Sequence, residues 1–197
     1  MIRHGLPLRI DGGAGPADPA LAPEGEEQAR LLAEHWGPFG LDAVWSSPQR
    51  RAFETAAPLA SATGHGITAE DGLREFDAHL NFYVPLEELR KDEAAWQRML
   101  AEWRSPEAEA QRLEFRDRVV ATVDAIAAGH RGGRVAVVCH GGVINAYLSH
   151  VLGIRDTIFV EPAYTSVSRV LVGGERKQLV SVNETPHLPG LVLPTRP

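Results

Sequence analysis

Apolar positions along the chain fall into two kinds of segment, one typical of buried strands and one typical of amphipathic helices. The clearest strand pattern is GRVAVVCHGG, at 133–142, whose run of β-branched residues suits a strand buried on both faces of a parallel sheet. Shorter strand patterns lie at 41–47 and 66–71. The alternating segments 165–174 and 177–183 predict a hairpin joined by a Gly-Gly turn.

Helical patterns lie between these strands. Pro23 and the glutamates after it mark a helix start, which a buried stripe from Ala29 to Trp36 extends. A second helix starts near Pro48, and Pro58 is expected to bend or interrupt it. Three further apolar stripes predict helices around 96–103, 115–126 and 144–152.

The alternation of strands and helices predicts an α/β fold. With 197 residues and 44% hydrophobic content, we expect a single domain over 1–197 that buries a proper core. Its expected architecture is a three-layer α/β/α sandwich with a mostly parallel central sheet. A small helical cap-like insertion at about 64–112 and a C-terminal hairpin complete the prediction.

Charge and cysteine content narrow the function classes. The net charge of −6 provides no electrostatic footprint for nucleic acid, although a local arginine cluster could still bind a small anion. Cys139 is the only cysteine, so no intrachain disulfide forms, which fits a reducing cytosol. The longest apolar runs are too short for a membrane span or a signal peptide, so we expect a soluble, cytoplasmic protein without a membrane partner. The oligomeric state is not readable from the sequence.

Candidate chemistry gathers at predicted strand ends, where ligands sit in open α/β sheets. His140 and Gly141 follow the strand at 135–139, and the next helix would offer unpaired N–H groups to an anion. Two arginines follow the strand at 41–47, and Arg3 and His4 follow Ile2. Each histidine or arginine alone is more commonly structural, but together they form the inventory of a phosphate pocket.

Six motifs, in order along the chain, resemble those of the histidine phosphatase superfamily, also called the phosphoglycerate mutase-like family. They are RHG (3–5), LAPEGEEQA (21–29), SSPQRRAFETA (46–56), LREFD (73–77), VVCHGG (137–142) and NETPHL (183–188). The register of the third motif selects Arg51 rather than Arg50, and the fourth selects Glu75.

The resemblance implies a mechanism. His4 would attack phosphorus and carry a phosphohistidine that water then hydrolyses, while Arg3, Arg51 and His140 would hold the phosphoryl oxygens. Glu75 would protonate the leaving oxygen and then activate water. The cationic side chains would supply the field, so no metal or cofactor is expected. The alternative role for Glu75 is a salt bridge to one of the arginines.

The chain departs from the family pattern in two segments. LPLR follows RHG where many members carry Glu-Thr-x-x-Asn, a segment that contributes to the phosphate pocket in the family, and FDAHLNFY replaces the Gly-x-Trp-Glu-Gly element after the acid. His79 and Tyr83 stand in that second segment. We expect both to line the substrate entrance, with a plain surface-loop histidine as the alternative for His79.

Other enzyme classes fit less well. Asn145, not arginine, lies six residues after Cys139, which excludes the Cys-x5-Arg motif of cysteine phosphatases, and no zinc-ligand spacing or nucleotide-binding loop occurs. Mutases tend to carry a larger insertion, so the modest 64–112 segment favours hydrolysis, and the expected partners are small phosphorylated metabolites. Mutase activity is the second hypothesis. A phosphate-binding or regulatory protein whose catalysis has decayed is the third.

The start of the sequence raises a separate expectation. Only Met1 and Ile2 precede Arg3, whereas a typical strand needs about five residues. We expect that the chain starts too late, that Met1–Ile2 form a stub of a strand beside the one ending at His140, and that a groove is left in the core where a strand belongs.

Overall fold

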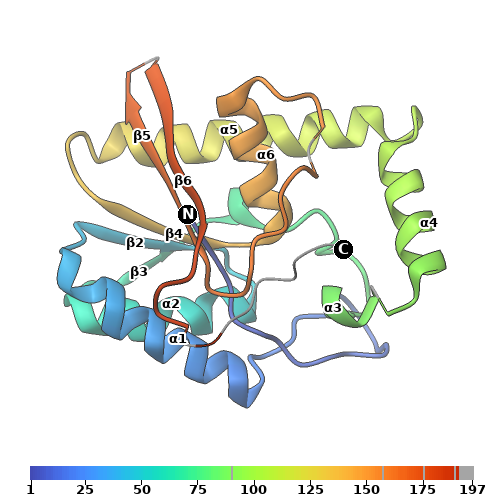
Figure 1. Ribbon diagram of the computed structural model, residues 1–197, viewed down its shortest axis with the longest axis horizontal. Helices are drawn as coiled ribbons and strands as arrows, with labels where there is room; N and C mark the ends of the chain where they lie inside the picture. Colours follow the sequence, from blue (N-terminus) through green and yellow to red (C-terminus); the bar gives the residue numbers. More distant parts are fainter. Residues whose placement is uncertain (90, 157, 175, 189, 191–197) are drawn as a thin grey trace.

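The central sheet of the computed structural model contains six strands (Figure 1). They are β1 (Ile2–Arg3), β2 (Ala43–Ser46), β3 (Ile67–Ala69), β4 (Val135–Cys139), β5 (Val167–Gly173) and β6 (Arg176–Glu184). Their order is β3-β2-β4-β1-β5-β6; the first four run parallel, and β5 and β6 form the antiparallel hairpin. The structure describes residues 1–89, 91–156, 158–174, 176–188 and 190.

Helices cover both faces of this sheet, as the three-layer prediction requires (Figure 1). They are α1 (Pro23–Trp36), α2 (Arg50–Thr63), α3 (Leu86–Leu89), α4 (Glu93–Arg104), α5 (Glu109–Gly129) and α6 (Gly141–Leu152), with short 3-10 turns η1 (Gly37–Phe39) and η2 (Asp71–Leu73). Apolar residues of α1 and α2 pack against β2 and β4 on one face, and those of α5 and α6 pack on the other. Among the described residues, no helix is both long and apolar enough to traverse a bilayer.

Pro58 lies inside helix α2. The helix runs from Arg50 to Thr63, so of the two expected effects, a bend or an interruption, the interruption does not occur. A proline removes only one backbone donor from such a helix. Burial of the flanking Ala56, Leu59 and Ala60 against the sheet favours the continuous helix over a break.

The cap-like insertion is shorter than the predicted 64–112. Its first part, β3, is a strand of the central sheet and pairs in parallel with β2. Its last residues belong to the first turn of α5. The helical addition therefore consists of α3 and α4, which lie beside the sheet rather than on it (Figure 1).

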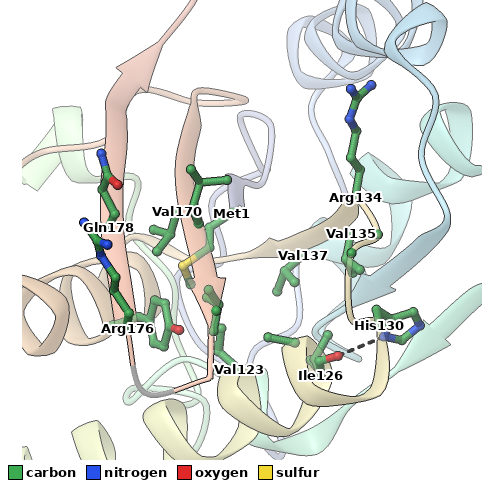
Figure 2. A pocket seen from close by; sticks show the side chains of 17 residues that line it. Met1, Val123, Ile126, His130, Arg134, Val135, Val137, Val170, Arg176 and Gln178 are labelled. Carbon is green, nitrogen blue, oxygen red and sulfur yellow. Dashed lines mark hydrogen bonds between the residues drawn. The ribbon is translucent and has the colours of Figure 1, made fainter.

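Strand β1 is a stub, as expected. It has two residues, which pair with Val138 and Cys139 of β4 and with Val167 of β5. A cavity of about 610 Å³ opens between β4 and β5 at the amino end of β1. Figure 2 shows Met1 at this cavity, between Val170 of β5 and Val137 of β4, with Val123 and Ile126 of α5 beside them. The expected groove in the core is therefore present, and it lies at the end of β1 away from His4.

Candidate active site

The carboxyl ends of β1 and β4 bring two histidines together. His4 follows β1, and its backbone N–H donates to Cys139 O at 2.9 Å. His140 follows β4, and the centroids of the two rings are 5.2 Å apart. Both side chains are buried, at 2% and 0% exposure. Because parallel strands end at one edge of the sheet, this arrangement follows directly from the register of β1 on β4.

The hydrogen bonds of His4 define its free nitrogen. Its Nδ1 lies 2.8 Å from Gly5 O, which can only accept, so Nδ1 carries the proton. Its Nε2 accepts from Arg51 Nε at 3.3 Å and therefore carries the lone pair. Burial, followed by the charges of Arg51 and Arg3, holds the pKa of His4 well below its usual range. The imidazole is neutral, which is the form a nucleophile needs.

Two buried arginines flank this ring. Arg51 lies in the first turn of α2, and the ring of Tyr83 covers its guanidinium at 4.7 Å. Arg3 is the last residue of β1 and donates from Nη1 to Pro162 O at 2.6 Å. Its guanidinium carbon lies 3.9 Å from the centroid of the Tyr164 ring. Both guanidinium groups are therefore fixed by contacts on their faces or edges before any ligand arrives.

The second histidine is oriented by Ser47. The Ser47 hydroxyl accepts from Gln49 N at 3.3 Å, and its Oγ lies 2.9 Å from His140 Nε2. When Ser47 donates to Nε2, the neutral ring carries its proton on Nδ1, where it can donate to an anion. Burial and the neighbouring cations, Arg51 first, keep the pKa of His140 well below its usual range. His140 is also the N-cap of α6, which brings Gly141 to the helix start beside Arg3.

Three buried nitrogens of this cluster have no hydrogen-bond partner within the described part of the chain. They are Arg3 Nε, Arg51 Nη1 and His140 Nδ1. Buried donors are nearly always satisfied, so a group of orphaned donors indicates that a ligand completes them. Two guanidinium donors and His140 Nδ1, around one neutral imidazole, suit a tetrahedral oxyanion such as a phosphoryl group.

Glu75 lies on the α6 side of this cluster. Its Oε2 accepts from Gly142 N at 2.8 Å and its Oε1 from Phe76 N at 3.0 Å. Burial, with Asp77 adding to it, raises the pKa of Glu75 to about 7. The salt bridge considered as an alternative is not among the ion pairs of the described residues, where the carboxyl group instead accepts backbone hydrogen bonds. A carboxyl group that holds its proton near neutrality can act as an acid.

Close backbone approaches explain two glycines of the motifs. A Cβ on Gly142 would lie 2.2 Å from Glu75 Oε1, so any other residue here would displace the carboxyl group from this position. A Cβ on Gly5 would lie 2.7 Å from Gly25 O, where the RHG segment crosses the start of α1. Gly5 of RHG and Gly142 of CHGG therefore permit close packing at the site.

The two residues expected at the substrate entrance occupy different places. Tyr83 reaches Arg51 because its backbone pairs with Ile10, with hydrogen bonds of 3.0 and 2.8 Å that join two distant loops. His79 lines a second cavity of about 310 Å³ together with Phe76 and Trp103. The structure thus brings Tyr83 to the anion cluster and places His79 in a neighbouring wall.

Sequence reasoning missed three residues that shape the site. Ser47 orients His140, and Gln49 Oε1 accepts from Glu75 N at 2.8 Å. Both lie in the segment SSPQRR, where buried polar residues between a strand and a helix are a usable signal. Tyr164 comes from a distant turn, and nothing in the sequence pattern indicates it.

Cys139 is a buried residue of strand β4. The side chain is fully buried in β4, and burial raises the pKa of the thiol to about 12, so it is not a nucleophile. Among the residues that the structure describes, no group of three histidine, cysteine, aspartate or glutamate side chains is arranged to hold a metal ion.

Comparison with known proteins now defines the family. A model of the histidine phosphatase superfamily, branch 1, matches residues 1–185. The chain belongs to this superfamily. It is 27% identical over 195 residues to "Putative phosphoserine phosphatase 2" of Hydrogenobacter thermophilus, which covers 95% of both chains. It is 31% identical over 163 residues to "Probable phosphoglycerate mutase GpmB" of Salmonella newport, which covers 78% of this chain and 74% of the relative.

Solved structures of the superfamily share the fold. A phosphoserine phosphatase mutant from Entamoeba histolytica in complex with phosphoserine superposes with a TM-score of 0.73 at 22% identity, covering 95% of this chain and 96% of that chain. A mycobacterial glucosyl-3-phosphoglycerate phosphatase in complex with VO3 gives 0.74 at 23% identity, covering 94% and 98%. The α/β prediction is confirmed, and the chain is a phosphatase or phosphoryl-transfer enzyme of this superfamily.

Proposed function

We propose that this chain is a histidine acid-type phosphatase that hydrolyses small phosphorylated metabolites through a phosphohistidine on His4 and needs no metal or other cofactor. One observation supports this most strongly. The lone pair on His4 Nε2 shares a buried cluster with three unpartnered nitrogens, Arg3 Nε, Arg51 Nη1 and His140 Nδ1. The same cluster that binds the oxyanion therefore contains a nucleophile in its reactive protonation state.

In the first step, the Nε2 lone pair of His4 forms a bond to phosphorus while the bond from phosphorus to the ester oxygen breaks. The electrons of that bond go to the leaving oxygen, which takes the proton of Glu75. Arg3, Arg51 and His140 donate to the phosphoryl oxygens, where charge spreads in the transition state. Gly141, at the start of α6, adds the helix N-terminus to this anion site.

In the second step, water attacks phosphorus and transfers a proton to Glu75. The electrons of the nitrogen–phosphorus bond return to His4, which restores the neutral imidazole. Glu75 alternates between acid and base, a role suited to a carboxyl group whose pKa is about 7. The leaving group would depart past Tyr83, with His79 in the wall of the adjoining cavity.

A mutase is the second candidate, because a relative named as a probable phosphoglycerate mutase is 31% identical to this chain. The short helical addition, α3 and α4, favours hydrolysis, because a mutase must keep water from the phosphoenzyme while the product re-binds. Phosphoserine and the phosphoglycerates belong in the first substrate panel, because relatives of this chain are named for them. A cytoplasmic location remains a prediction from the cysteine content.

Turnover of p-nitrophenyl phosphate tests the proposal. We expect phosphate release that persists in the presence of a chelator and disappears in His4→Ala. Arg50→Ala provides the matched control, because Arg50 neighbours Arg51 but is exposed and paired with Glu54. Activity retained in His4→Ala, or loss of activity with chelator, would overturn the mechanism. Interconversion of phosphoglycerates without net phosphate release would favour the mutase.

A further inference from the structure

The segment 162–166, which directly precedes β5, contacts both Arg3 and His4. Pro162 O accepts from Arg3 Nη1 at 2.6 Å, and Ser166 O accepts from the Arg3 backbone N–H at 3.1 Å. The ring of Tyr164 lies 3.9 Å from the Arg3 guanidinium carbon and 5.7 Å from the His4 ring centroid. This segment therefore fixes the guanidinium plane whose Nε remains available to a ligand.

Thr165 holds the segment in an unfavourable conformation. Its φ is 56°, in the left-handed region that β-branched residues rarely occupy, and its side chain is fully buried. Such a conformation persists only where surrounding contacts impose it, and it is typical of functional sites. At Thr165 it turns the chain so that Tyr164 faces Arg3 while the Thr165 N–H donates to His4 O at 3.3 Å.

The contacts that impose this conformation come from the C-terminal motif NETPHL. Asn183 Oδ1 accepts from Ala163 N at 2.7 Å, and His187 Nε2 lies 3.0 Å from Thr165 Oγ1. The chain after β6 turns toward α1, where His187 meets Trp36 (Figure 1). These two hydrogen bonds connect the motif to the segment 162–166, and through it to Arg3 and His4.

The direction of each hydrogen bond in this chain of contacts follows from its partners. Trp36 Nε1 can only donate, so His187 Nδ1 accepts, and the proton of the neutral ring lies on Nε2. His187 Nε2–H therefore donates a hydrogen bond to Thr165 Oγ1, and the Thr165 hydroxyl donates to Tyr164 O at 2.8 Å. Burial, followed by the charge of His35, lowers the pKa of His187 to about 4, so this neutral form persists at neutral pH.

We propose that His187 and Asn183 are positioning residues for Arg3, acting through the strained turn at Thr165 and the ring of Tyr164. The inference rests on the proposed function, because the task it assigns to Arg3 is to hold a phosphoryl group. Without the His187 contact, the turn relaxes, Tyr164 leaves the guanidinium, and Arg3 binds the oxyanion less tightly. Orthovanadate mimics the transition state of phosphoryl transfer. Its inhibition constant therefore measures the loss of oxyanion affinity directly.

The test compares orthovanadate inhibition and the KM for p-nitrophenyl phosphate in wild type, His187→Ala and His187→Gln. We expect His187→Ala to raise the inhibition constant of orthovanadate and the KM for p-nitrophenyl phosphate about tenfold each. This factor follows from weakening one charge-assisted contact. Gln can place an N–H near the Nε2 position, so His187→Gln should recover most of the affinity. Val123→Ala is the stability control, because Val123 is buried beside the cavity at the far end of β1.

A double-mutant cycle with Thr165→Gly tests the route. Glycine adopts a φ of 56° without strain and lacks the hydroxyl, so the effect of His187→Ala should fall below about twofold in this background. An undiminished effect would overturn the route through Thr165. Inhibition of His187→Ala equal to wild type, or an equal rise in Val123→Ala, would overturn the positioning role. If wild type itself neither binds orthovanadate nor turns over substrate, the proposed function fails as well.

Discussion

Glu75→Gln should change the pH dependence of stability as well as activity. The carboxyl group of Glu75 is buried, and its pKa is raised from the usual 4.5 to about 7. Below the lower value, the group is protonated in both the folded and the unfolded chain, so burial carries no ionisation penalty. Between the two values, the unfolded chain releases the proton while the folded chain keeps it. The contribution of Glu75 to folding stability therefore falls as the pH rises to about 7, and then levels off.

The size of this effect follows from the two pKa values. Their separation, from 4.5 to about 7, corresponds to about 3 kcal/mol at about 1.4 kcal/mol for each factor of ten. Gln has the shape of the protonated acid but does not ionise. The stability of Glu75→Gln relative to wild type should therefore rise by about 2–3 kcal/mol between about pH 5 and about pH 8. The amide nitrogen of Gln cannot accept a hydrogen bond, so the variant loses the bond from Gly142 or Phe76. This loss changes the difference in unfolding free energy by the same amount at every pH.

Urea unfolding of both proteins across this pH range measures the effect. Glu107→Gln, a substitution of an exposed glutamate, is the control and should show a flat difference from wild type. The reasoning would be refuted if the difference between Glu75→Gln and wild type were equally flat, or if the variant lost relative stability as the pH rose. The same variant should have lost turnover of alkyl phosphates, because Gln cannot protonate the leaving oxygen.

Three further predictions concern the site. With an alkyl phosphate, kcat should fall about tenfold per pH unit above about 7, because Glu75 loses its proton. The fall should be shallower with p-nitrophenyl phosphate, whose leaving group needs less protonation. Parallel profiles for the two substrates would contradict the acid role of Glu75. Gly142→Ala should lower kcat for alkyl phosphates about a hundredfold, because its Cβ would lie 2.2 Å from Glu75 Oε1, and steady-state kinetics near the wild-type level would show that the loop yields. Tyr83→Leu should weaken phosphate inhibition about fivefold by uncovering Arg51, while Tyr83→Phe keeps the ring 4.7 Å from the guanidinium and should match wild type; equal losses in both variants would point to the hydroxyl instead.

Much of the site could be predicted because local patterns and the sheet rule suffice for it. His4, Arg51 and His140 each follow a strand, and the parallel register of β1, β2 and β4 brings those strand ends to one edge. The residue types then indicate anion chemistry without further structural knowledge.

The remainder depends on contacts between distant segments. Tyr83 was expected at the entrance with His79, but only the pairing of Tyr83 with Ile10 decides which of them reaches Arg51. The predicted bounds of the helical addition were too wide, because the pattern at 66–71 predicts a strand but does not show that it pairs with β2 in the central sheet. The turn at Thr165 is invisible in sequence, since a threonine gives no signal for a positive φ.

Trapping of the phosphoenzyme tests the central claim most directly. Wild-type protein mixed with radiolabelled substrate and quenched within one turnover should carry an acid-labile, alkali-stable phosphoryl group, which peptide mapping places on His4, the only histidine of the segment 1–34. His4→Ala should carry none. Phosphate release without any labelled intermediate, or a label that maps to His140, would contradict the assignment of His4 as the nucleophile.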